Sequence, residues 1–369
     1  MKPMRIAQIA PLYESVPPQG YGGTERVIAA LCDGLSEAGH DVTLFAAGSS
    51  ATQARLSPMA PSPLRMCMSR AEMIDVAPHL HLRMLADVYS RGHEFDVIHA
   101  HTDLWTLPFV DSTPTPTVLT MHGRLDLDIV RRVLPDYPHV PLVSISDYQR
   151  RPLARWNLDW TATVYNGLDL RRYLATSIGR NDYLAFVGRI NSEKRPDLAV
   201  EVASRTGYPL RVAAKVDPMD VEYFETEIEP LFAEANVDFL GEIGELAKPE
   251  FYAGAAATLF PSDWPEPFGL VMIESLAAGT PVIALRRGSV PEILVDGVTG
   301  FICDDEDEMI QAVERLDEID PDECRRQALR FTKDEMCARY LDVYDALVTD
   351  STPRTLSNAR DDHDVLAAS

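Results

Sequence analysis

The stretch that decides the fold is residues 260–283, FPSDWPEPFGLVMIESLAAGTPVI. It begins where a short apolar run ends, passes through a proline-rich loop, and continues into an apolar helical pattern that opens at Gly269. The loop carries Glu266, and Glu274 lies just over one turn inside the helix. A strand, a loop and a helix in this order are the repeating unit of an α/β protein with a parallel sheet.

The same stretch combines two kinds of ligand-binding group. The start of a helix offers free main-chain N–H groups, which favour a phosphate or another anion. Glu266 and Glu274 add two carboxylates that suit sugar hydroxyls. Two carboxylates could instead hydrolyse a glycosidic bond, but they would then have to face each other across that bond, and one short segment makes this arrangement less natural.

Strand and helix signals alternate along the chain in two sets. Short apolar, β-branched runs predict strands, and the segments between them have helical periodicity, for example 25–38 and 79–90. The first set of predicted strands is 5–10, 41–46, 96–101, 117–121, 142–146 and 163–165. The second set is 183–187, 210–214, 237–240, 257–260, 281–285 and 300–303. This pattern predicts an α/β fold with two parallel sheets.

A polar, turn-rich segment separates the two sets and begins with Asn166-Gly167-Leu168-Asp169. We therefore expect an N-terminal domain over residues 1–169 and a C-terminal domain over residues 170–334, with a cleft between them. Residues 351–369 are polar and lack periodicity, which predicts a disordered tail. Because ligands of open α/β sheets bind beyond the carboxyl ends of the strands, the loops that follow strands matter most.

Composition excludes several classes of protein. The net charge of −23 disfavours nucleic-acid binding, and the acidity lies mainly in the second half. Five cysteines without a C-x-x-C pair indicate neither a disulfide framework nor a zinc knuckle. The chain starts directly with a strand-like segment and has no apolar run long enough to cross a bilayer, so we expect a cytoplasmic protein without a signal peptide.

A glycine- and proline-rich loop at 11–24 follows the first predicted strand and ends with Gly22 and Gly23 at a helix start. Main-chain N–H groups there suit a phosphate, and glycine permits its close approach. A plain flexible loop is the alternative. The pattern lacks the Gly-x-Gly-x-x-Gly fingerprint of a dinucleotide-binding fold.

A second candidate anion site follows the strand at 183–187. Gly188 and Arg189 end this strand, and Lys194 precedes the next helix. Cations in one loop of an acidic domain suggest a specific anion site, and a solvated basic turn is the alternative.

Histidines and acidic pairs raise the question of catalysis or metal binding. His122 stands at the end of a predicted strand, where a titratable imidazole is either catalytic or structural. His99 and His101 could share one strand face as metal ligands, but no third ligand is apparent, so we expect them in the core or cleft. The Asp126-Leu127-Asp128 motif resembles a metal site of sugar transferases, but we expect it to be the first turn of a helix over 128–134, where carboxylates suit the helix dipole. We predict no metal.

These motifs together resemble glycosyltransferase family 4, whose members are retaining enzymes with the GT-B fold: two Rossmann-like domains facing each other across a cleft. The match extends from about residue 5 to residue 348 in the expected order. It rests on the Glu266-x7-Glu274 motif, the Gly188 to Lys194 loop, the Gly22-Gly23 loop, His122 and Asn166-Gly167.

The resemblance implies a nucleotide-sugar donor, a hydroxyl acceptor and no metal or other cofactor. It implies that Arg189 and Lys194 bind the diphosphate, that Glu274 binds the ribose, and that Glu266 and His122 contact the donor sugar. Main-chain N–H groups near Gly22 and Gly23 and at Phe268, Gly269, Leu270 and Val271 would share the phosphate. It also implies that a helix at 335–348 returns to the first domain.

The base, the sugar and the acceptor stay open. A nucleotide-sugar epimerase of the same fold, a nicotinamide oxidoreductase and a non-catalytic sugar-nucleotide binder are the alternatives. Many relatives dock on anionic membranes through a basic first domain, but this one has a net charge of −4. We therefore expect at most weak membrane contact, through arginines such as Arg150, Arg151 and Arg155.

Overall fold

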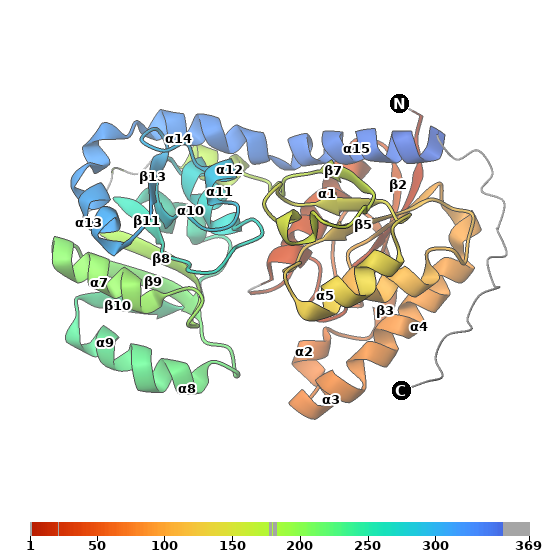
Figure 1. The fold of residues 1–369 in the computed structure, drawn as a ribbon, viewed down its shortest axis with the longest axis horizontal. Coiled ribbons are helices and arrows are strands. Elements are labelled where there is room, and N and C mark those ends of the chain that lie inside the picture. The colour runs from red at the N-terminus through yellow and green to blue at the C-terminus, as the bar shows by residue number, and fades with distance from the viewer. Residues whose placement is uncertain (1, 21, 177–178, 180–182, 350–369) are drawn as a thin grey trace.

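The chain forms two α/β lobes side by side, each built on one parallel sheet (Figure 1). The computed structural model describes residues 2–20, 22–176, 179 and 183–349, so the expected disordered tail lies outside the described residues. The first sheet has the order β3-β2-β1-β4-β5-β6-β7 and the second β10-β9-β8-β11-β12-β13. The prediction of an α/β fold with two parallel sheets is confirmed.

The strands of the first sheet are β1 (Arg5–Ile9), β2 (Asp41–Ala47), β3 (Arg55–Ala60), β4 (Val97–Ala100), β5 (Thr117–Met121), β6 (Leu142–Ser144) and β7 (Trp160–Thr163). Those of the second sheet are β8 (Leu184–Arg189), β9 (Leu210–Lys215), β10 (Val237–Gly241), β11 (Ala257–Phe260), β12 (Val282–Leu285) and β13 (Gly300–Cys303).

The α-helices of the first lobe are α1 (Gly23–Glu37), α2 (Leu64–Cys67), α3 (Arg70–Asp75), α4 (Ala77–Ser90) and α5 (Asp128–Val133). The next helices are α6 (Arg171–Ala175), α7 (Pro196–Thr206), α8 (Val221–Tyr223), α9 (Glu229–Glu234), α10 (Lys248–Ala253), α11 (Leu270–Ala277), α12 (Val290–Ile293), α13 (Glu306–Glu314) and α14 (Pro321–Ala328). The last helix, α15 (Lys333–Thr349), packs against α1 and β4 of the first lobe.

The two edge strands of the first sheet differ from the prediction: one was not predicted, and the other was predicted with the wrong bounds. The sequence did not predict β3, because Arg55, Ser57 and Pro58 interrupt its apolar pattern. Proline is tolerated there since β3 is an edge strand with a neighbour on one side only. The last strand occupies Trp160–Thr163 and not 163–165, because β7 is the other edge and is only partly buried.

The chain crosses between the lobes twice, and the two crossings lie side by side. Leu168 donates its main-chain N–H to the Phe331 oxygen at 3.1 Å and accepts from the Lys333 N–H at 2.9 Å. A Cβ at Gly167 would overlap the main-chain oxygen of Thr332. The glycine is therefore required because the second crossing approaches so closely.

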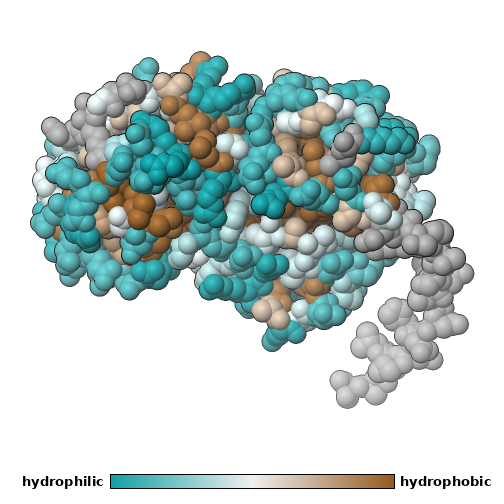
Figure 2. Space-filling model, turned by 90° about the horizontal axis from the view of Figure 1, so that it is seen from above, coloured by the Kyte–Doolittle hydropathy of each residue, from teal (hydrophilic) through white to brown (hydrophobic). Residues whose placement is uncertain are grey.

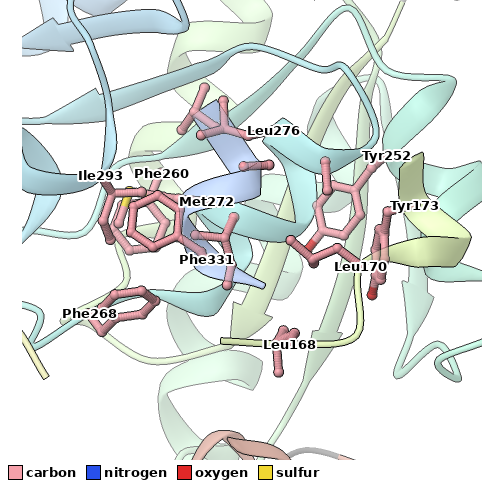
Figure 3. Close-up of a cluster of buried hydrophobic side chains, with 14 of the residues drawn as sticks. Leu168, Leu170, Tyr173, Tyr252, Phe260, Phe268, Met272, Leu276, Ile293 and Phe331 are labelled. Atoms are coloured by element: carbon pink, nitrogen blue, oxygen red, sulfur yellow. The ribbon is translucent and has the colours of Figure 1, made fainter. Parts of the chain in front are cut away.

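A buried apolar cluster fixes the loop that carries Glu266. Figure 3 shows Phe268 near Phe331, in one cluster with Met272 and Leu276 of α11. The rings of Phe268 and Phe331 form an edge-to-face pair with centroids 5.7 Å apart. Hydrophilic side chains cover much of both lobes on the face seen in Figure 2, in keeping with the net negative charge.

Candidate active site

The loops after β8 and β11 bring Lys194 and Glu266 together. The Lys194 ammonium forms an ion pair with the Glu266 carboxylate, and each side chain is 15% exposed. The ammonium also lies 5.5 Å from the Phe260 ring centroid and 5.2 Å from that of Trp264. The cation and the carboxylate neutralise each other. Because both side chains are partly exposed, a ligand that carries charge and hydroxyl groups can reach them.

The starts of α1 and α11 approach each other across the lobes. A Cβ at Gly23, the first residue of α1, would lie 3.5 Å from Leu270 Cδ1 at the start of α11. Gly269, which precedes α11, has a left-handed φ of 89°, and a Cβ there would crowd Met272 and Phe260. Two sets of free main-chain N–H groups therefore converge on one place, which suits a polyanion such as a diphosphate.

Glu274 lies at the centre of a charged chain that the sequence did not predict. Its carboxylate, 2% exposed, accepts from Lys248 Nζ at 3.1 Å and from the Tyr252 hydroxyl at 2.9 Å. Lys248 also lies 2.8 Å from Glu245, which pairs with Arg26 of α1. This chain of ion pairs joins α1 of the first lobe to the buried carboxylate of the second.

Arg189 stands apart from the Lys194 pair and has a partner of its own. Its guanidinium lies 3.2 Å from Asp220 and its side chain is 37% exposed. A Cβ at the preceding Gly188 would meet nothing within 4 Å, so the end of β8 borders open space. Phe268, which precedes α11, has a buried side chain, and Val271 lies in the first turn of α11. Both residues can offer only main-chain N–H groups to a ligand.

A pocket of about 360 Å³ opens between the lobes. Arg124 and Tyr148 line it from the first lobe, and Pro265 and Pro267 line it from the second. Arg124 pairs with Asp126 at 2.7 Å and reaches Glu193 of the other lobe at 3.0 Å. This space lies next to the Glu266 loop.

His122 follows β5 and is half-buried beside His101, which follows β4. Burial lowers the pKa of His122 to about 4, so its ring is neutral at neutral pH. Asp103 is also near, and its non-glycine φ of 47° is left-handed. Desolvation raises the pKa of the Asp103 carboxyl to about 6, against the lowering effect of a hydrogen bond from the His122 main chain.

The residues considered as metal ligands have other partners. His99 bonds to Tyr344 and Thr120, and His101 bonds to Gln8 and His122. In the described part of the chain, no group of three or more His, Cys, Asp or Glu side chains could hold a metal ion. Asp128 begins α5, as expected from the interpretation of the Asp-x-Asp motif as a helix start.

Sequence reasoning missed Lys248, Tyr252, Glu245 and Arg26, which surround Glu274, and Asp103 beside His122. No local signal marks them, because each becomes part of the site only when distant segments pack together. The position of Lys248 at the start of a helix is the one local feature that could have drawn attention to it as a site residue.

The architecture and the site define the class first: two parallel α/β lobes with an anion-binding site between them. The family model "Glycosyltransferase Family 4" matches residues 21–172, and "Glycosyl transferases group 1" matches residues 176–333. The chain is a GT-B glycosyltransferase, and within that class it belongs to the family 4 type. The predicted family is confirmed.

Similar proteins agree with this family. D-inositol 3-phosphate glycosyltransferase of Thermobifida fusca is 26% identical over 345 residues, 78% of each chain. Phosphatidyl-myo-inositol mannosyltransferase of Mycolicibacterium smegmatis is 25% identical over 342 residues, 84% of each chain. The crystal structure of AviGT4, a glycosyltransferase involved in avilamycin A biosynthesis, has a TM-score of 0.71 at 26% identity and covers 94% of this chain and 99% of its own. In the described residues no helix is long and apolar enough to cross a membrane.

Proposed function

We propose that the protein is a retaining glycosyltransferase that moves a hexosyl group from a nucleoside-diphosphate sugar to an acceptor hydroxyl without a metal ion. The observation that carries this proposal is the convergence of the α1 and α11 N-termini beside the Lys194–Glu266 pair. Helix N-termini and an ammonium group can together neutralise a diphosphate leaving group, which is the role that a metal ion plays in other transferases.

The proposed donor site divides its work between the two ends of the nucleotide sugar. Glu274 binds the ribose hydroxyls, and Lys194 and Arg189 bind the diphosphate. The ion pair between Lys194 and Glu266 opens when the donor binds: the ammonium turns to phosphate, and the carboxylate accepts from the donor sugar. A solved structure of the Anabaena protein HepE with UDP-glucose, 17% identical with a TM-score of 0.72, shares the fold.

The proposed chemistry needs no side-chain nucleophile. The acceptor hydroxyl attacks from the face that the leaving phosphate vacates, and the departing phosphate takes its proton, so the anomeric configuration is kept. His122 contacts the donor sugar near the reaction centre. We further propose a cytoplasmic location, in line with the use of soluble nucleotide sugars.

The test starts with the donor. Thermal shifts of the protein with UDP, GDP and ADP and with their hexose conjugates identify the nucleotide, and a transfer assay with inositol, inositol phosphate and simple sugars as acceptors follows. The proton NMR spectrum of the product gives its anomeric configuration. Inversion of that configuration would refute the retaining mechanism.

Two variants connect the assay to the site. Lys194→Ala and Glu274→Ala should each weaken nucleotide binding at least tenfold, the loss of one charge-assisted hydrogen bond. Lys2→Ala, at the exposed N-terminus, is the control. Unchanged donor affinity in both site variants would refute the assignment. Conversion of the donor alone would indicate an epimerase, absorbance changes with NAD an oxidoreductase, and binding without transfer to any acceptor a sugar-nucleotide binder.

A further inference from the structure

A buried hydrogen-bonded chain connects His122 to the last helix. His122 Nε2 lies 2.8 Å from His101 Nδ1, and His101 Nε2 lies 2.8 Å from the side-chain oxygen of Gln8 in β1. The Gln8 amide nitrogen lies 3.0 Å from the hydroxyl of Tyr344 on α15. Gln8, His101 and Tyr344 are all fully or almost fully buried, so water cannot replace any of these partners.

The position of one proton decides the direction of the whole chain. The Tyr344 hydroxyl accepts from the Gln8 amide nitrogen at 3.0 Å and lies 2.6 Å from His99 Nδ1. Tyr344 therefore donates its single proton to His99. His99 then carries its own proton on Nε2 and donates it to Thr120 Oγ1 at 2.7 Å.

Gln8 then passes this direction on to the histidines. With its NH₂ group turned to Tyr344, Gln8 presents its carbonyl oxygen to His101, and a carbonyl oxygen can only accept. Burial lowers the pKa of His101 and of His122, so each ring carries one proton. His101 must hold that proton on Nε2, which leaves its Nδ1 to accept from His122 Nε2–H. The second ring nitrogen of His122, Nδ1, carries no proton.

We propose that Gln8, His101 and Tyr344 are positioning residues that hold His122 in the tautomer whose bare Nδ1 accepts a hydrogen bond from a hydroxyl of the bound sugar. No hydrogen bond to Nδ1 is found among the described residues, and the neighbouring Asp103 carboxyl accepts from the His122 main chain, so Nδ1 can accept from a bound sugar. The inference deepens the proposed function, on which it rests for the presence of a sugar at His122.

This tautomer selects the chemistry of the sugar. A bare nitrogen attracts a hydroxyl, which can donate, and repels a carboxylate or phosphate oxygen, which cannot. A sugar with a hydroxyl at the position facing His122 is accepted, and a uronic acid with a carboxylate there is rejected. The opposite tautomer, with Nδ1–H, would reverse this preference. The buried hydrogen-bonded chain therefore determines which sugar His122 accepts, although Gln8, His101 and Tyr344 do not contact the sugar.

The decisive measurement needs neither donor nor activity. In the nitrogen NMR spectrum of the full chain labelled with ¹⁵N-histidine, a protonated and a bare ring nitrogen have clearly separate shifts. The His122 signals are assigned by their loss in His122→Gln. We expect Nε2 protonated and Nδ1 bare at pH 7.5. A protonated Nδ1 would overturn the proposal even if the enzyme transfers sugar, whereas failure of transfer with this tautomer present would overturn only the proposed function.

Two matched variants on α15 test the role of Tyr344. Tyr344 and Tyr340 are both buried and one turn apart, but the Tyr340 hydroxyl bonds at 2.8 Å to Thr120, which lies on the far side of His99 from Tyr344, and not to Gln8. Tyr344→Phe should release the Gln8 amide, give signals of both His122 tautomers, and lower turnover about tenfold with the donor that supports transfer. Tyr340→Phe should retain the wild-type His122 signals.

Gln8→Met supplies a second variant of similar size, since it removes the acceptor for His101. It should also give mixed His122 tautomers. A single, unchanged His122 tautomer in folded Tyr344→Phe and Gln8→Met, with folding checked by circular dichroism, would show that these residues do not hold it.

Discussion

The buried carboxylate of Glu274 makes Lys248 the most informative position for a stability measurement. Lys248→Met removes the ammonium but keeps most of the aliphatic chain. Glu274 then loses its cationic partner and keeps the hydrogen bond from the Tyr252 hydroxyl at 2.9 Å, with 2% of its side chain exposed to water. Breaking a buried ion pair costs about 3–5 kcal/mol, and because Lys248 is 13% exposed we expect the lower end, about 3 kcal/mol.

The assay is equilibrium urea unfolding of four proteins: wild type, Lys248→Met, Glu274→Gln and the double variant. Removing both charges leaves no unpaired charge, so the double variant should be more stable than Lys248→Met, with a coupling free energy of about 2 kcal/mol. Lys333→Met is the matched control. Lys333 is similarly buried, but its partner Glu37 is 41% exposed and stays hydrated, so the loss should be below about 1 kcal/mol.

Two results would refute the reasoning. One is a loss of stability in Lys248→Met no larger than that in Lys333→Met, which would mean that water reaches Glu274. The other is strict additivity of the two single substitutions in the double variant, which would mean that Lys248 and Glu274 do not interact.

Three further predictions concern acid stability, the Glu266 loop and metal ions. His81 is fully buried and accepts from the Leu12 N–H at 2.9 Å, and desolvation lowers its pKa to about 4. The unfolded chain therefore takes up a proton at a higher pH than the folded protein does. Acidification from pH 7.5 to 5 should lower the free energy of unfolding by about 2 kcal/mol through this residue. His81→Gln should lose that part of the pH dependence in urea titrations, and an unchanged slope would contradict it. Gly288 has a left-handed φ of 55°, and a Cβ there would overlap the Glu266 main chain. Gly288→Ala should therefore weaken nucleotide binding measured by calorimetry. Gly207→Ala is the control and should leave binding unchanged, because Gly207 has a similar φ but no neighbour within 4 Å of an added Cβ. EDTA should leave the transfer rate unchanged, and restoration of a lost rate by Mg²⁺ or Mn²⁺ would contradict the metal-free proposal.

Most of the fold could be predicted from the sequence because the relevant signals are local. An apolar strand buried on both faces, such as β5 or β11, is marked by its own residues, and both were predicted with the observed bounds. Edge strands carry a weaker signal since one side has no partner, and β3 was missed for that reason. Lys194, Glu266 and Glu274 could be singled out because a loop after a strand, or a helix start, is also a local feature.

What only the tertiary structure decided are the partners of those residues. Lys248 and Arg26 reach the neighbourhood of Glu274 from separate segments, and Gly167 is required by Thr332 rather than by a turn of its own. Gln8 and Tyr344 are 336 residues apart in sequence and hydrogen-bonded in the fold. Periodicity and turn residues determine local backbone structure, whereas the partner of a buried polar group depends on which distant segments pack around it.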